Sequence, residues 1–397
     1  MFIEILISTL IGVFAGTITG LVPGIHINLV GTALVTLSAT AFAVVNPIYL
    51  ICFIAAMAIT HTFIDFIPSI FLGCPDTDTQ LSVLPGHELL KEGKGYEAVM
   101  LTARGGIFAI FLFLLLSFPL AFIFSKIYSL IHSLMFWILL ATSFILIFTE
   151  KKKLTALFVF VISGLLGLCV LNSSVKEPLL PLLTGLFGSS LLVVSIKNKI
   201  QIPSQEITAP KSKMLKPLIG AIIASPLCGF LPGLGSGQAA ILGNSVSRTD
   251  KKGFLSLIGA TNILVMGLSF VSLYAISKTR TGAAAAIQQI IGTLSWKLLL
   301  IIMLVVLLSG IASFFLTKIL TRFFANKIKN VNYSALSIFT LVFLLIITCI
   351  VSGLLGVIVL IASTLTGIYC NSLSVKKTHM MGCLLIPTLL FYFLEMI

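Results

Sequence analysis

Long runs of apolar residues, separated by short polar segments, dominate the sequence. A run of about 20 apolar residues can cross a bilayer as an α-helix. Backbone groups in hydrocarbon must be hydrogen-bonded internally, so these runs predict helices rather than open sheets. We therefore predict an all-α polytopic membrane protein with roughly 10–12 membrane segments, some of them broken or re-entrant. The clearest runs are Ile107–Phe124, Leu134–Phe148, Leu154–Leu171, Leu298–Leu316, Ser337–Val351 and Met380–Phe393.

A segment with the pattern Gly-x-x-Pro-Gly, which we call the Pro-Gly kernel, occurs once in each half of the chain. Residues 20–24 read Gly-Leu-Val-Pro-Gly, and residues 229–233 read Gly-Phe-Leu-Pro-Gly. Proline removes a backbone donor, so each kernel is expected to interrupt a membrane helix. Interrupted helices at matching positions of two halves point to a transporter binding site. Pro and Gly are also frequent in ordinary membrane helices, so a simple packing kink stays an alternative.

Loop charge predicts that the two halves have opposite orientations. No Lys or Arg precedes Lys91, whereas the second kernel lies between Lys216 and Arg248. Because basic loops face the cytoplasm, the N-terminus is predicted to be extracytoplasmic, with the two kernels entering the membrane from opposite sides. We divide the chain into membrane repeat 1 (1–150), a connecting helix pair with a cytoplasmic linker (151–216) and an inverted membrane repeat 2 (217–397).

Two four-residue polar segments echo each other with opposite charge. Residues 76–79 read Asp-Thr-Asp-Thr and residues 278–281 read Lys-Thr-Arg-Thr, each after an apolar run. Charges at membrane depth are costly unless they are paired, hydrated or functional. The basic segment could hold an anionic substrate and the acidic one a coupling cation. Each could also be an ordinary solvated loop.

The predicted substrate site combines the kernels, the polar residues that follow them and the basic segment. Backbone N–H groups at a helix start favour anions, and charged donors strengthen that preference. The predicted substrate-binding residues are Pro23, Gly24, Asn28, Pro232, Gly233, Ser236, Gln238, Lys278, Thr279, Arg280 and Thr281.

An ionisable pair inside a predicted membrane helix suggests ion coupling. His61 and Asp65 lie four residues apart and therefore share one helix face. Such a pair could serve proton or Na⁺ coupling, or could simply bond this helix to a neighbour. The predicted coupling-ion residues are His61, Asp65, Asp76, Thr77, Asp78 and Thr79.

Composition narrows the class further. Hydrophobic residues make up 58% and charged residues 9%, far from the quarter that is typical of soluble domains. The net charge of +13 is spread over short loops, so it predicts membrane topology rather than nucleic-acid binding. The seven cysteines form no metal-ligand spacing and are expected to be small buried apolar residues. No phosphate-binding loop and no nucleophile–base set stands out, so we expect neither an enzyme nor a resident cofactor.

The residues already named resemble a known family, the large membrane subunit of tripartite tricarboxylate transporters (TctA type). The similarity lies in the Gly-rich segment 12–31, in the block from Cys74 to Ala98 with its Pro85-Gly86-His87-Glu88 and Lys91–Gly95 stretches, and in residues 229–243. The chain is shorter than typical members. It also has Lys-Thr-Arg-Thr where the family usually shows a small-residue Pro-Gly segment.

The resemblance implies a permease for carboxylates such as citrate, driven by an ion gradient in the cell membrane. It also implies an extracytoplasmic solute-binding protein and a small membrane subunit as partners. Membrane lipids and a second copy of the chain, as a homodimer, complete the partners that we consider. Two rival functions stay open: a translocase for a polyprenyl-phosphate or similar lipid phosphate, and a non-transporting membrane scaffold or receptor.

Overall fold

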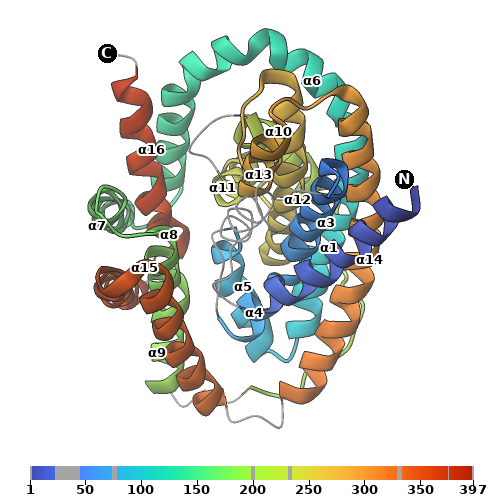
Figure 1. The fold of residues 1–397 in the computed structure, drawn as a ribbon. Coiled ribbons are helices and arrows are strands. Elements are labelled where there is room, and N and C mark those ends of the chain that lie inside the picture. The colour runs from blue at the N-terminus through green and yellow to red at the C-terminus, as the bar shows by residue number, and fades with distance from the viewer. Residues whose placement is uncertain are drawn as a thin grey trace. The chain divides into compact units, whose positions relative to one another are not determined.

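The regular elements of the described chain are all helices (Figure 1). The computed structural model describes residues 2–22, 45–73, 78–197, 202–230, 235–328, 333–373 and 375–395. The helices are α1 (Phe2–Leu21), α3 (Pro47–Ile64), α4 (Phe66–Phe71), α5 (Gln80–Lys91), α6 (Gly95–Phe148), α7 (Lys153–Leu171), α8 (Leu179–Leu183), the π-helix η1 (Thr184–Ser189), α9 (Ser190–Lys197), α10 (Leu215–Phe230), α11 (Ser236–Ser247), α12 (Lys251–Ile276), α13 (Gly282–Ile291), α14 (Trp296–Ile328), α15 (Tyr333–Ser372), the 3₁₀-helix η2 (Lys377–Met381) and α16 (Gly382–Leu394).

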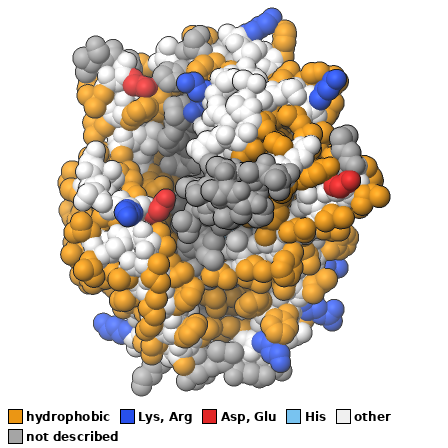
Figure 2. Space-filling model, viewed as in Figure 1, with side chains coloured by type: hydrophobic (Ala, Val, Ile, Leu, Met, Phe, Trp, Pro, Cys, Tyr) orange, Lys and Arg blue, Asp and Glu red, His pale blue; other side chains and the backbone are white. Residues whose placement is uncertain are grey.

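Nine helices among the described residues are long and apolar enough to cross a membrane. Large apolar side chains also face outward, as hydrocarbon solvent requires, with Leu154 83% and Leu354 77% exposed. Figure 2 shows hydrophobic side chains over much of the described surface, with Lys and Arg scattered among them. These observations confirm the predicted all-α polytopic membrane protein.

The structure differs from the sequence prediction at two of the apolar runs. Ile107–Phe124 and Leu134–Phe148 were expected as separate spans, but both lie within the continuous helix α6. The polar residues between them include no helix breaker, so nothing in that segment ends the helix. The cysteines among the described residues differ in burial. Cys52, Cys228, Cys370 and Cys383 are buried, whereas Cys169 and Cys349 are exposed.

The Cα positions form two compact units that interleave along the chain. The first unit comprises Met1–Pro68, Val99–Tyr128 and Ala209–Arg322. The second comprises Ser69–Ala98, Ser129–Thr208 and Phe323–Ile397. The predicted repeats were defined by matching sequence segments and loop charge and not by contacts, so their boundaries stay a prediction.

In the first unit, α1 and α3 pack closely and run in the same direction (Figure 1). Gly12, Gly16 and Gly20 on α1 meet α3 near Phe53, Met57 and His61 in turn, so both residue numbers rise together. A side chain at any of these glycines would collide with the α3 backbone or a β-carbon, and their absence allows the close approach. At the start of α3, the side chain of Asn46 accepts a hydrogen bond from the backbone N–H of Ile48 (3.0 Å).

The second long buried helix of the first unit, α12, runs opposite to α3. Along α3 and α6, Phe63 lies against Gly106, and Ile59 and Ile110 meet at Gly310, so the numbers run in opposite senses. Along α6 and α12, Gly106 lies against Ile263 and Phe113 against Gly267, so the numbers rise together. Since α6 is antiparallel to α3 and parallel to α12, α3 and α12 are antiparallel.

The glycine contacts between α1 and α3 make a testable prediction. Gly16→Val places side-chain atoms against the backbone oxygen of Met57, so we expect the midpoint of thermal unfolding in detergent to fall. Overpacking of this kind costs roughly 1–3 kcal/mol. Phe14→Leu, at an outward-facing position two residues away, serves as the control. Equal unfolding midpoints for wild type and Gly16→Val would contradict the close approach of the two helices.

Candidate functional site

The basic segment folds back along the helix that precedes it. Ser277 ends α12 in the left-handed conformation, with φ 53°. The hydroxyl of Ser272 donates to the backbone oxygen of Lys278 (3.0 Å), and the hydroxyls of Ser269 and Thr281 are 2.8 Å apart. As the chain advances from Lys278 to Thr281, it therefore returns to an earlier level of α12. We call residues 277–281 the second polar turn.

A new helix starts at the end of the second polar turn. The hydroxyl of Thr281 accepts a hydrogen bond from the backbone N–H of Ala284 (3.3 Å) and caps α13. The amide of Gln288 in turn donates to the backbone oxygen of Ser277 (3.2 Å), so α13 runs back toward the end of α12. The N–H groups of its first turn therefore point toward the middle level of α12.

The acidic segment is described only in part, in the second unit, and shares one contact with the basic segment. Asp76 and Thr77 lie outside the described residues, but Asp78 and Thr79 are described. The hydroxyls of Thr79 and Ser69 are 2.7 Å apart, and α5 begins directly after Thr79. We call residues 73–79 the first polar turn. Both turns thus bond a threonine, one residue before a short helix, to a serine of the preceding apolar run.

The two cations of the second polar turn have different surroundings. Lys278 is exposed, whereas Arg280 is half-buried. The Nη2 of Arg280 donates to the hydroxyl of Tyr128 (3.4 Å). Its Nε is buried and has no hydrogen-bond partner within the described part of the chain. Arg280 is therefore the stronger candidate for an anion ligand.

The second kernel leads into a helix with buried polar residues at its start. Pro232 and Gly233 lie outside the described residues, as do Pro23, Gly24 and Asn28 of the first kernel. Ser236 and Gln238 are buried in the first turn of α11. The side-chain oxygen of Gln238 accepts a hydrogen bond from the backbone N–H of Gly235 (3.0 Å). This oxygen thus caps the helix, which is a structural role that the sequence alone did not reveal.

The ionisable pair of α3 is buried, as the apolar run around it suggested. The Nδ1 of His61 lies 3.1 Å from the hydroxyl of Thr19 on α1, so the imidazole connects the two parallel helices. Asp65 directly follows the last residue of α3 and is 4% exposed. The two residues therefore differ in position: one bonds α1 to α3, and the other marks the end of α3.

Sequence reasoning missed one buried polar residue of α12. Asn262 lies in the middle of the helix and is 3% exposed. Neither its side-chain oxygen nor its nitrogen has a hydrogen-bond partner within the described residues. Buried amides without partners are rare because each polar atom loses its hydration. The signal was present, since an asparagine interrupts an apolar run of helical length.

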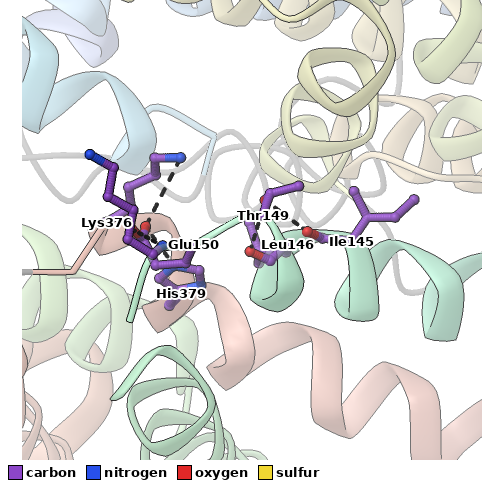
Figure 3. Close-up of polar contacts among 7 residues, drawn as sticks. Ile145, Leu146, Thr149, Glu150, Lys376 and His379 are labelled. Atoms are coloured by element: carbon purple, nitrogen blue, oxygen red, sulfur yellow. Dashed lines mark hydrogen bonds and ion pairs between the residues drawn. The ribbon is translucent and has the colours of Figure 1, made fainter. Parts of the chain in front are cut away.

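An ion-paired cluster lies in the second unit (Figure 3). The Nε2 of buried His379 is 3.3 Å from a carboxylate oxygen of Glu150, and the Nζ of Lys376 is 4.0 Å from the same oxygen. Burial raises the pKa of Glu150, but hydrogen bonds from Lys151 and His379 and the charge of Lys376 outweigh it and lower the pKa overall. The cluster joins the α6–α7 loop to the segment before α16.

The fold and these turns define a class: a polytopic helical membrane protein in which two matched polar turns each begin a short helix. The comparisons identify the family. The model of the tripartite tricarboxylate transporter TctA family matches residues 6–382, so the chain belongs to that family and the resemblance is confirmed. The uncharacterized protein MJ1079 of Methanocaldococcus jannaschii is 33% identical over 400 residues, covering 98% of each chain. No solved structure matches the chain.

Membership of the family places this multi-pass membrane protein among components of tricarboxylate transporters. It also agrees with the expectation that the chain is a transporter component rather than an enzyme.

A buried histidine next to the first polar turn makes a prediction about pH. Burial, together with the positive charges of Lys91 and Lys377, lowers the pKa of His87 from its ordinary value of 6.5 to about 4. The imidazole is therefore neutral in the folded protein at pH 7. Because the unfolded chain binds the proton more readily, stability is fully present above pH 6.5 and falls as the pH decreases toward 4.

We expect the free energy of unfolding of wild type to fall by about 1.4 kcal/mol per pH unit as the pH decreases from 6.5 to 4. The midpoint of thermal unfolding should fall with it. His87→Gln, which has no titrating group, should reduce this dependence. The measurement is thermal unfolding of both proteins across that range. Identical pH dependence in the two proteins would show that His87 is not the group responsible.

Proposed function

We propose that this protein is the permease of an ion-gradient-driven transporter for an anionic organic solute, a di- or tricarboxylate. The observation that carries the proposal is the matched pair of polar turns, in which Ser69–Thr79 and Ser269–Thr281 make the same hydroxyl contact. Two matching contacts of this kind, each just before a short helix of an otherwise apolar chain, would serve to position a polar site. Membership of the TctA family supports carboxylates as the solute class.

An anion is favoured by the chemistry of the second polar turn. The half-buried guanidinium of Arg280 has a buried Nε with no hydrogen-bond partner among the described residues. The first turn of α13 offers backbone N–H groups and the positive end of its helix dipole beside it. Guanidinium groups bind carboxylates through two parallel hydrogen bonds, which gives both affinity and orientation. Thr279 and Thr281 add hydroxyls to the same turn.

Alternating access is the transport mode that we propose. The antiparallel course of α3 and α12 in the first unit supports two oppositely oriented repeats, as in other transporters with inverted symmetry. In such transporters, one part rocks against the other around a site that stays fixed. The two Pro-Gly kernels stay part of the proposed site.

The proposed setting follows the family. The protein would work in the cell membrane with an extracytoplasmic solute-binding protein and a small membrane subunit, with its N-terminus outside. Na⁺ or H⁺ would supply the driving force, through the coupling-ion residues named above.

The test replaces the two basic residues of the second polar turn. Lys278→Ala combined with Arg280→Ala should reduce carboxylate uptake into proteoliposomes by tenfold or more, since charge-assisted hydrogen bonds contribute about 1.5–3 kcal/mol each. Arg280→Ala alone should account for most of the loss, because Lys278 is exposed. Lys297→Ala, an exposed basic residue at the start of α14, is the matched control.

Full uptake by the double variant would remove the second polar turn from the substrate site. Movement of a labelled polyprenyl phosphate, with no carboxylate flux, would favour the lipid-phosphate translocase instead. Absence of any flux under Na⁺ and proton gradients, with the partner subunits present, would favour a scaffold or receptor.

A further inference from the structure

We propose that Asn262, Asp65 and Thr62 form a binding site for Na⁺ in the interior of the first unit. The inference rests on the proposed function, because Na⁺ would be the coupling ion of the transporter. It adds a ligand, Asn262, that neither the sequence nor the family membership indicates. It also separates Asp65 from His61, whose imidazole is engaged with α1.

The unpartnered amide of Asn262 is the starting point. Both of its polar atoms are buried and lack hydrogen-bond partners within the described residues. Leaving a buried donor or acceptor unsatisfied costs about 1–3 kcal/mol for each group. A bound cation would engage the amide oxygen, and the amide nitrogen could then donate to an anionic oxygen of the solute. One side chain would thus connect the ion to the solute.

Asn262 and Asp65 lie at the same depth in the first unit. The site of a β-carbon on Gly106 would be 2.8 Å from the ring of Phe63 and 3.3 Å from Ile263, so these two residues share one level. Asn262 precedes Ile263 by one residue, and Asp65 follows Phe63 by two. At a rise of about 1.5 Å per residue, both lie within about 3 Å of that level along their helices.

The faces of the two helices also agree. On α3, one face packs on α1 through Met57 and His61, and another meets α6 through Phe63. Thr62 lies on neither face, whereas Asp65, four residues after His61, lies at the edge of the α1 face. The further neighbours of α3 in the first unit include α12 and α13. Thr62 therefore turns toward that side and Asp65 lies at its border, since successive helical residues are separated by about 100°.

On α12, Asn262 is turned away from α6. Ile263 and Gly267 meet α6, whereas Asn262 lies seven residues before Ser269 and shares its face. Ser269 contacts Thr281, the cap of α13. Asn262 thus lies on the side of α12 where α13 begins, below the second polar turn that we assign to the anion.

The ligand chemistry fits Na⁺. The three side chains supply a carboxylate, an amide oxygen and a hydroxyl oxygen, which are hard ligands preferred by hard cations. The hydroxyl of Thr62 donates to the backbone oxygen of Ala58 (2.8 Å), which leaves its lone pairs for a cation. No group of three His, Cys, Asp or Glu side chains suited to a transition metal occurs in the described ranges.

The experiment measures Na⁺-dependent thermal stabilisation and Na⁺ binding by calorimetry, with K⁺ or choline replacing Na⁺ at constant ionic strength. Wild type should bind Na⁺ and unfold at a higher temperature in its presence. Asn262→Leu should abolish this response and should raise the unfolding midpoint without Na⁺, because it removes an unsatisfied buried amide. A merely destabilising variant would lower that midpoint.

Asp65→Asn should weaken Na⁺ binding by tenfold or more, since it removes the only formal charge among the three ligands. Asn262→Asp, which retains an oxygen ligand, should restore binding relative to Asn262→Leu. Ser225→Ala is the matched control. It removes a buried hydroxyl on α10 of the first unit that has no hydrogen-bond partner among the residues the structure describes, and it should leave the Na⁺ response unchanged.

Unchanged Na⁺ binding in Asn262→Leu, or no Na⁺ response in wild type, would overturn the site. Carboxylate uptake measured in parallel distinguishes this failure from failure of the proposed function. Uptake that persists under a proton gradient alone keeps the transporter and removes the Na⁺ site. Na⁺ binding without any carboxylate uptake keeps the cation site and removes the proposed solute.

Discussion

Every polar group that this chain carries into the bilayer must find a partner within the protein, because hydrocarbon offers none. Helices satisfy that requirement for the backbone, which is why the regular structure of the described chain is helical. The informative places are those where the chain departs from a helix. Next to both departures, among the described residues, a threonine hydroxyl contacts a serine hydroxyl of the preceding helix. The rest of the proposed site depends on these two contacts.

Close helix packing gives the polar turns a rigid support. In the first unit, α1 lies against α3 along three glycines, and α6 lies against both α3 and α12. Backbones in such close contact cannot shift independently, since interiors packed at this density are bistable rather than continuously deformable. Asp65 and Asn262 lie at a similar level within this closely packed unit.

Much of this arrangement could be predicted from the sequence, because hydrophobic length and loop charge are local signals. The apolar runs predicted membrane helices, and the segments at 76–79 and 278–281 were recognised as a pair. The continuity of α6 could not be predicted, because polar residues between two runs resemble a loop when packing is unknown. The capping role of Gln238 also depends on a backbone geometry that spacing alone does not specify.

Less of the candidate site than of the fold could be predicted from the sequence. Lys278 and Arg280 look equivalent in the sequence, yet one is exposed and the other half-buried. Asn262 was not predicted as a site residue, because a single amide in an apolar run matches no sequence motif. Its significance lies in the lack of a hydrogen-bond partner within the described part of the chain, which only a structure shows. The roles of isolated polar residues are thus the part of a membrane site that residue spacing predicts least well.

The opposite charges of the two segments are compatible with the hydroxyl contact that both share. The bond that shapes each turn joins two neutral hydroxyls, so it does not depend on the charge of the residues beside it. The flanking positions are therefore free to differ, and they are Asp76 and Asp78 in one turn and Lys278 and Arg280 in the other. The same hydroxyl contact thus accompanies an acidic segment in one case and a basic segment in the other. A transporter that couples a cation to an anion needs both, and duplicating a charge-independent turn is a direct route to that chemistry.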